Sequence, residues 1–137
     1  LGLRMDRECS NALALAEFLE SEMGLCVNYP GLESSPYHEV AKRMLQNGYG
    51  AIVTVRVGSK EKAFKIINAL KLPYILANIG DTKTLVIHPE STIATHLSDK
   101  EKEQSGVYDD LIRISVGIED IEDLKQDFKQ AIESVEE

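Results

Sequence analysis

Arg113 is the residue whose type and setting most directly suggest chemistry. It lies within residues 111–116, where alternation predicts a strand that places Arg113 on the face opposite to Ile112 and Ile114. A guanidinium there must reach water or hold an anion, because burying it unpaired is costly. Its planar fork suits a carboxylate, which can accept two parallel hydrogen bonds. On this pattern alone, an arginine that simply faces solvent is the commoner case. Whether Arg113 binds an anion therefore depends on the rest of the chain.

The elements that would position Arg113 alternate between helices and strands. Apolar residues at three- and four-residue steps predict helices, and β-rich runs between glycine, proline and asparagine turn signals predict strands. The predicted helices cover residues 4–22, 36–46, 60–70 and 121–135, and the predicted strands cover residues 25–28, 51–57, 74–79, 84–88 and 111–116. The mostly apolar strand 51–57 is expected to be buried on both faces, and residues 89–107 are expected to form a long irregular loop. This order predicts an α+β fold, a two-layer sandwich of helices on a four- to five-stranded sheet, with residues 1–137 as a single domain.

Composition narrows the class of protein. The 137 residues carry a formal net charge of -8, which argues against a nucleic-acid partner. No apolar run is long enough to span a bilayer, so no membrane span is predicted. Cys9 and Cys26 are expected to be buried thiols in a reducing, cytoplasmic compartment. With three scattered histidines, the two cysteines show no ligand spacing, and no metal site is predicted.

Several short motifs occur together along the chain. They are MDRECSNA at residues 5–12, NYPGLE at 28–33, PYHEVAK at 36–42, ANIGDTKTLVIHP at 77–89 and LIRISVGIEDIED at 111–123. Over essentially its whole length the chain thereby resembles the C-terminal domain of the Cys/Met-metabolism enzymes that use pyridoxal phosphate. The NIGD version of residues 78–81 favours, more weakly, the O-acetylhomoserine sulfhydrylase (homocysteine synthase) branch of that family.

The resemblance implies a fold and a site. The fold would be the small C-terminal domain of a fold type I pyridoxal-phosphate enzyme. Arg113 would bind the α-carboxylate of the amino-acid substrate, Asn78 would line the same site, and Thr92 is a weaker candidate. Many relatives have Thr-Thr-His or Met-Thr-His where this chain has TIATH at residues 92–96, so the roles of Thr92, Thr95 and His96 stay open.

The cofactor itself is expected to lie outside this chain. In the family that the chain resembles, a lysine of a large N-terminal domain holds pyridoxal phosphate as a Schiff base, and no lysine here has that context. Nor does the sequence hold a glycine-rich phosphate cradle. The chain begins at Leu1 and almost at once with a helix, which suggests a C-terminal fragment that lacks its cofactor-binding domain. The fragment alone is therefore predicted to be inactive and to contain no catalytic residue.

The parent protein is expected to make homocysteine, or methionine, from O-acetylhomoserine and sulfide or a thiol, as a tetramer of the kind the family forms. Two alternatives on the same scaffold are a methionine γ-lyase and a cystathionine γ-synthase. A third alternative, of another class, is a stand-alone oligomerisation or binding module without catalytic activity.

A few polar residues are assigned structural roles. A turn is the favoured interpretation of residues 29–31, and a hydrogen-bonded structural histidine that of His88. Glu119 and Asp120 are interpreted as residues that start the last helix. Ser115 shares the predicted face of Arg113, where steadying that arginine and simply facing solvent explain it equally well.

Overall fold

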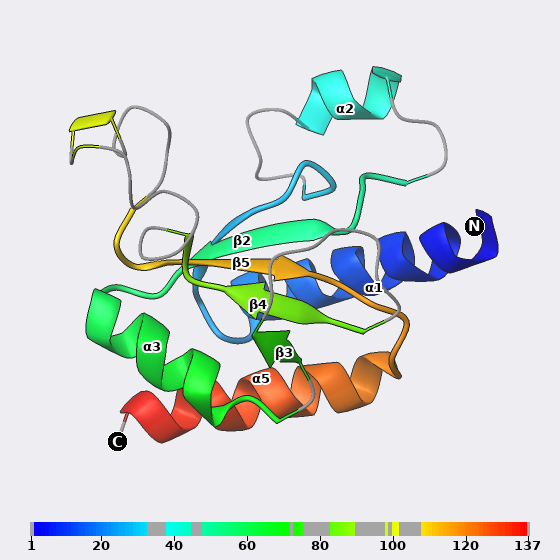
Figure 1. Ribbon diagram of the computed structural model, residues 1–137. Coiled ribbons are helices and arrows are strands. Elements are labelled where there is room, and N and C mark those ends of the chain that lie inside the picture. The colour runs from blue at the N-terminus through cyan, green and yellow to red at the C-terminus, as the bar shows by residue number, and fades with distance from the viewer. Residues whose placement is uncertain are drawn as a thin grey trace.

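The computed structural model describes residues 2–32, 38–44, 48–71, 73–75, 83–89, 98, 100–101 and 108–136. The chain runs through nine helices and strands in these ranges, most of which are labelled in Figure 1. They are α1 (Gly2–Ser21), β1 (Cys26–Asn28), α2 (His38–Met44), β2 (Ile52–Arg56), α3 (Lys60–Ala69), β3 (Tyr74–Ile75), β4 (Leu85–Ile87), β5 (Leu111–Ser115) and α5 (Ile121–Glu136). Residues 76–79 of one predicted strand, and most of the predicted loop 89–107, lie outside the described residues.

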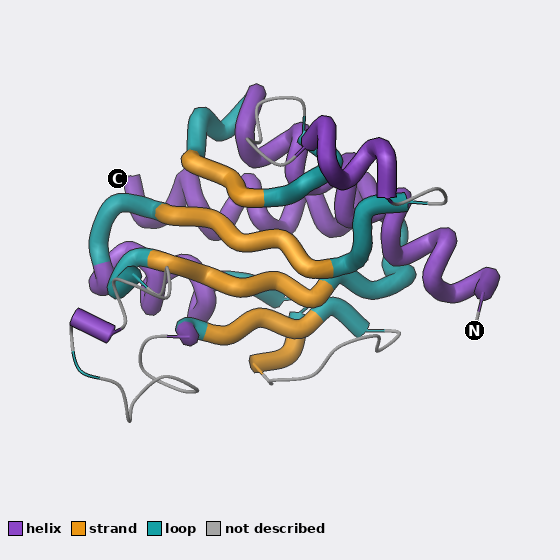
Figure 2. Tube along the Cα trace, turned by 90° about the horizontal axis from the view of Figure 1, so that it is seen from above, coloured by secondary structure: helices purple, strands orange, loops and turns teal. Residues whose placement is uncertain are grey.

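The strands form one five-stranded sheet in the order β1-β2-β5-β4-β3. All neighbouring pairs are antiparallel except β3 and β4, which are parallel. Helices α1, α3 and α5 pack on one face of this sheet, and α2 lies on the other side (Figures 1 and 2). The predicted α+β sandwich is confirmed, and β5, which carries Arg113, is its central strand.

The core lies between the sheet and the three helices. Alternate residues of β2 and β5 point into it, and each is at most 3% exposed: Val53, Val55, Ile112 and Ile114. The helices contribute Leu15 and Leu19 of α1, Ile66 of α3, and Leu124 and Phe128 of α5. The predicted sidedness of β5 is therefore confirmed.

The expectation that β2 is buried on both faces is wrong. Val53 and Val55 are buried, whereas Ile52 and Thr54 are half-buried and Arg56 is exposed. The physical reason is that α1, α3 and α5 all cover the same face. The opposite face therefore keeps polar and charged side chains, as is common in antiparallel sheets.

Local signals place the ends of the elements as the sequence predicts. Ser59 caps α3, its hydroxyl oxygen accepting from the Lys62 N–H at 3.1 Å. Asp120 caps α5, its carboxylate accepting from the Glu122 N–H at 2.9 Å. Gly24, with φ +66°, takes the left-handed conformation just beyond α1.

The prediction of two buried thiols is wrong. Cys26 is exposed and Cys9 is half-buried, and both are free. Cys26 is exposed because β1 is an edge strand and its side chain lies on the face that the three packed helices do not cover. Within the described part of the chain, no helix has the length and apolar character needed to cross a membrane.

Candidate carboxylate-binding site

Arg113 lies in the middle of the sheet face that α1, α3 and α5 leave uncovered. In the strand register it stands directly between Thr54 of β2 and Ile87 of β4. The residue is half-buried, and its Nε atom is buried and has no hydrogen-bond partner among the described residues. Buried polar groups in folded proteins nearly always have partners, and leaving a charged donor unpaired is costly. The geometry therefore indicates that Arg113 is arranged for an anion.

A carboxylate is the anion that best matches this arginine. The guanidinium stays protonated in proteins and offers donors in one plane, and a carboxylate offers two oxygens in one plane. Because a strand fixes the backbone of Arg113, the ligand would be oriented as well as bound. The other predicted site residues, Asn78 and Thr92, lie outside the described residues, as do Thr95 and His96.

A buried polar network fixes the turn that follows β5. Glu119 accepts two hydrogen bonds from Thr84, one from its N–H and one from its hydroxyl, both at 2.8 Å. The Thr84 hydroxyl oxygen in turn accepts from the Gly117 N–H at 2.9 Å. The Asn11 side-chain amide donates to the carbonyls of Gly117 and Glu119 at 3.0 and 2.8 Å. The network joins α1, the start of β4 and the end of β5, and so holds the strand that carries Arg113.

The role assigned to Glu119 from the sequence was therefore incomplete. Asp120 does cap α5, but the Glu119 side chain points to Thr84, 35 residues earlier in the chain. Only the tertiary structure brings these two residues together, and no local pattern near Glu119 signals the contact.

Arg56 is a second arginine on the uncovered face, and the sequence reasoning missed it. Its Nε donates to Asp110 at 3.0 Å, and its guanidinium lies 4.0 Å from the ring centroid of Tyr108. The hydrogen bond to Asp110 raises the pKa of Arg56, with a smaller opposing effect of burial. The alternation of β2 could have revealed this residue, but the expectation of a strand buried on both faces concealed it.

The other singled-out polar residues serve the fold. His88 is buried, with Nε2 at the Asp109 carbonyl and its ring against Phe64. The buried Tyr29 hydroxyl donates to the Gly50 carbonyl at 2.8 Å, and burial, with smaller effects of nearby residues, raises the pKa of Tyr29. Both contacts agree with the structural interpretations of His88 and of the turn at residues 29–31.

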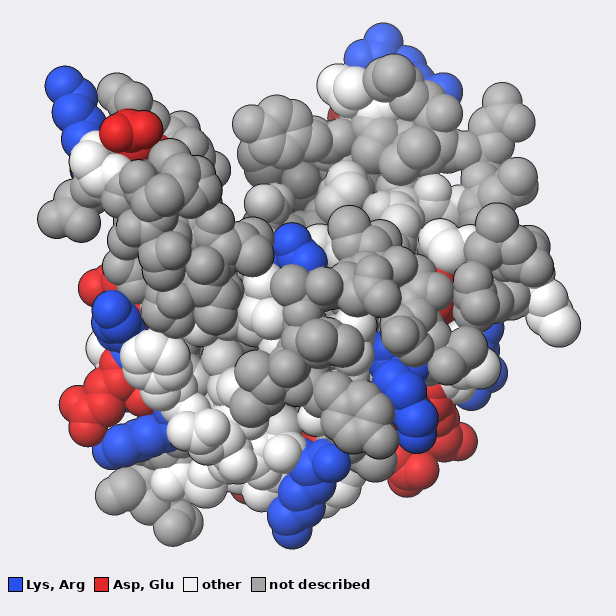
Figure 3. Space-filling view, viewed as in Figure 1, with Lys and Arg blue, Asp and Glu red and all other residues white. Residues whose placement is uncertain are grey.

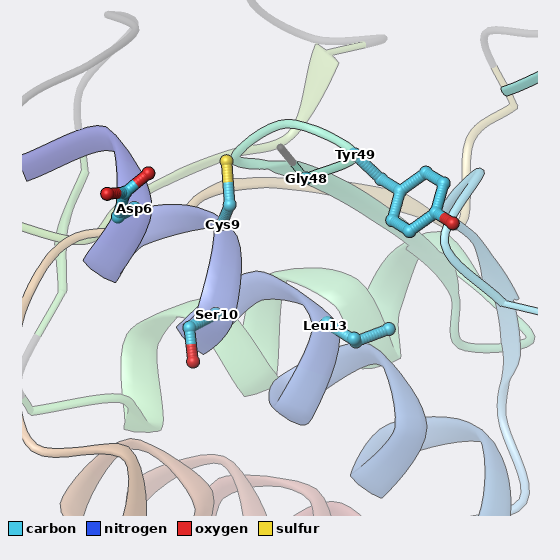
Figure 4. A pocket seen from close by; sticks show the side chains of 6 residues that line it. All are labelled: Asp6, Cys9, Ser10, Leu13, Gly48 and Tyr49. Carbon is cyan, nitrogen blue, oxygen red and sulfur yellow. The ribbon is translucent and has the colours of Figure 1, made fainter. Parts of the chain in front are cut away.

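A hollow beside α1 does not form a convergent site. Figure 4 shows Cys9 pointing towards Gly48, while Asp6, Ser10 and Tyr49 point in different directions. A Cβ atom on Gly48 would lie 2.9 Å from the Cβ of Cys9, so this contact is close packing. Within the described residues no group of histidine, cysteine and acidic side chains could hold a metal ion. In Figure 3, the coloured acidic and basic side chains on the visible face are interspersed rather than gathered by sign.

The chain thus forms a small α+β domain whose uncovered sheet face carries a central arginine, and the Nε of this arginine has no hydrogen-bond partner among the described residues. Residues 1–133 match the family model of the Cys/Met metabolism PLP-dependent enzymes, where PLP is pyridoxal phosphate. The chain belongs to this family.

Named relatives agree with that assignment. The chain is 50% identical to the homocysteine synthase of Schizosaccharomyces pombe, with 97% of this chain and 32% of that protein aligned. It is 42% identical to the O-succinylhomoserine sulfhydrylase of Pseudomonas aeruginosa, with 96% of this chain and 33% of that protein aligned. A crystal structure of a Campylobacter jejuni protein assigned as an O-acetylhomoserine (thiol)-lyase superposes with a TM-score of 0.92 at 36% identity, over 96% of this chain and 32% of that one. That structure carries N'-pyridoxyl-lysine-5'-monophosphate. The chain spans about a third of the length of these proteins.

Proposed function

We propose that this chain is the C-terminal, substrate-binding part of a pyridoxal-phosphate-dependent O-acetylhomoserine sulfhydrylase. The whole protein would make homocysteine, or methionine, from O-acetylhomoserine and sulfide or a thiol. The names of the relatives and the family membership support this reaction class. In this proposal residues 1–137 form one domain, and a cofactor-binding domain with the cofactor lysine precedes it. A homotetramer and a cytoplasmic location belong to the same proposal, because the family resemblance predicts the assembly and the free cysteines suit a reducing compartment.

The observation that carries the proposal is the buried Nε of Arg113, which has no partner in the part of the chain that the structure describes. Pyridoxal phosphate, when bound, supplies the electron sink for elimination and replacement at the γ-carbon. Arg113 would take the substrate α-carboxylate through two hydrogen bonds and fix the direction of the bonds at the α-carbon. Asn78 would add a donor to the same carboxylate, and Thr92 is a weaker candidate for that site.

The fit between site and ligand rests on charge and position. Arg113 is the central cation of the uncovered face, and Thr54 and Ile87 flank it. An amino-acid carboxylate would supply the partner that the Nε of Arg113 lacks among the described residues. In this proposal Arg113 would recognise the amino acid, and the residues and cofactor in the rest of the protein would carry out the chemistry at the γ-carbon.

The experiment uses the purified full-length protein with pyridoxal phosphate. O-acetylhomoserine and sulfide should give homocysteine, and Arg113→Ala should lower kcat/KM about 30- to 5,000-fold. That range corresponds to roughly 2–5 kcal/mol for truncating one partner of a buried charge pair. The control is Lys129→Ala, which removes an exposed cation from α5 on the opposite side of the sheet and should leave the kinetics unchanged.

Two outcomes would contradict the proposal in different ways. Near-normal kinetics of Arg113→Ala would mean that Arg113 does not bind the substrate carboxylate. Formation of 2-oxobutyrate from methionine, with no homocysteine from the ester, would move the reaction to the lyase branch. The relatives are named for both O-acetyl and O-succinyl esters, so the acyl group of the substrate needs a separate argument.

A further inference from the structure

Two arginines are diagonal neighbours on the uncovered face of the sheet. Thr54 pairs with Arg113, and Arg56 pairs with Leu111, so Arg56 and Arg113 occupy diagonal positions of the β2–β5 ladder. Residues in this relation are about 7–8 Å apart. Because like charges so close repel each other, such a pair calls for compensation by anions.

Asp110 provides that compensation for Arg56 and also fixes its orientation. One Asp110 oxygen accepts from Arg56 Nε at 3.0 Å and the other from the Gly58 N–H at 3.0 Å. The Asp110 side chain is only 7% exposed. Tyr108 stacks on the guanidinium plane at 4.0 Å. With its Nε and one flat face occupied, Arg56 keeps its two terminal nitrogens available, and among the described residues neither has a hydrogen-bond partner.

Arg56 lines a hollow of about 260 Å³. Asn28, Thr54 and Tyr108 contribute polar groups to its wall, together with Cys26 and Leu111. Thr54 connects the hollow to the first site, because it is also the cross-strand partner of Arg113. A ligand could therefore reach both arginines without crossing the sheet.

The charge balance selects the class of ligand. Asp110 offsets one of the two positive charges, so one positive charge remains, and a phosphate dianion would exceed it by one negative charge. A carboxylate carries a single charge and two coplanar oxygens, which match the two terminal nitrogens of a fixed guanidinium. Coplanar donors held in place in advance lose little entropy on binding.

We propose that Arg56, held by Asp110 and Tyr108, is a second carboxylate-binding group beside Arg113. The carboxylate could end the acyl chain of a homoserine ester, as in a succinyl ester, or belong to a free dicarboxylate such as succinate. The first source rests on the proposed function and would make Arg56 a determinant of acyl-group specificity. The second source does not depend on the reaction.

The kinetic test uses the full-length protein with pyridoxal phosphate and compares kcat/KM for O-succinylhomoserine and O-acetylhomoserine. If the ester is the source, Arg56→Gln should lower the succinyl-to-acetyl ratio by about tenfold or more, mainly through KM, the loss expected for one charge-assisted contact. Arg56→Lys keeps the charge but not the planar fork, and should lose most of the same preference. The matched control is Lys65→Gln, which removes a cation from an exposed ion pair on α3 and should leave the ratio unchanged.

A binding test that needs no turnover uses phenylglyoxal, which modifies arginine side chains. Mass spectrometry of the peptide that contains Arg56 measures how far succinate, or acetate as the single-carboxylate probe, protects this residue. Protection by succinate with an unchanged ester ratio in Arg56→Gln would assign the site to free dicarboxylates. A ratio within about twofold of wild type, together with no protection by either probe, would overturn the proposal.

The two proposals can fail separately. Turnover of the acetyl ester with neither effect at Arg56 would remove the second carboxylate site and leave the proposed function intact. Protection of Arg56 by succinate in a protein that turns over neither ester would support the second carboxylate site and contradict the proposed function.

Discussion

Glu119→Ala is the perturbation that tests how the strand of Arg113 is held. The Glu119 carboxylate accepts from both the N–H and the hydroxyl of Thr84, and Thr84 is fully buried. The Thr84 hydroxyl also accepts from the Gly117 N–H. Alanine at position 119 would leave two buried donors of Thr84 without their acceptor.

The expected loss can be worked out from these contacts. A hydrogen bond to a charged group contributes roughly 1.5–3 kcal/mol, and a buried donor left unpaired costs about 1–3 kcal/mol. The Thr84 hydroxyl can rotate towards another acceptor, whereas its backbone N–H cannot. Counting the N–H fully and the hydroxyl in part gives a loss of about 3 kcal/mol in the free energy of unfolding, or about 100-fold in the folding equilibrium.

Equilibrium urea denaturation of this chain measures the change, with the slope against urea checked for constancy. The control is Glu122→Ala, since Glu122 also lies at the start of α5 but is exposed and forms only a 3.7 Å ion pair with Lys125. That control should change the free energy of unfolding by less than about 0.5 kcal/mol. If Glu119→Ala matched the control, the argument that the carboxylate is the necessary acceptor for Thr84 would be refuted.

Two further predictions concern the turn that contains Tyr29. Burial raises the pKa of Tyr29 above its ordinary value of about 10, so its contribution to stability is complete below pH 10 and is lost as pH rises towards the folded-state pKa. Tyr29→Phe should cost about 1 kcal/mol at pH 7 by removing the bond to Gly50, and should show a shallower loss of stability than wild type in urea titrations above pH 10. Gly31→Ala would bring a Cβ atom within 2.5 Å of the Tyr29 ring, and should lower the free energy of unfolding by roughly 1–3 kcal/mol in the same assay. An unchanged midpoint in Gly31→Ala would show that the ring moves aside freely.

Arg113 illustrates how far the sequence could lead towards the site. Alternation alone placed it on the face opposite to Ile112 and Ile114, and the structure confirms both the face and the helix layer behind it. The family resemblance, rather than the local pattern, linked it to a carboxylate. What the sequence could not show is that its Nε is buried with no partner among the described residues, because that depends on side chains of other strands.

Arg56 and Glu119 show the opposite case. Arg56 was covered only by the wrong expectation of a strand buried on both faces, and Glu119 was explained only as a residue that starts a helix. Their partners, Asp110 and Thr84, lie 54 and 35 residues away. A single sequence contains no local pattern that predicts contacts between residues so far apart in the chain.

The sequence by itself determined the elements, their order and the buried face of β5, because periodicity, capping residues and turn residues act within a few positions of each other. It also determined the family, through motifs spread over the whole chain. Only the tertiary structure decided which sheet face stays uncovered, and that Arg56 and Arg113 become diagonal neighbours on it. The register of β2 against β5 sets that relation, and register depends on the packing of the whole core and not on either strand alone.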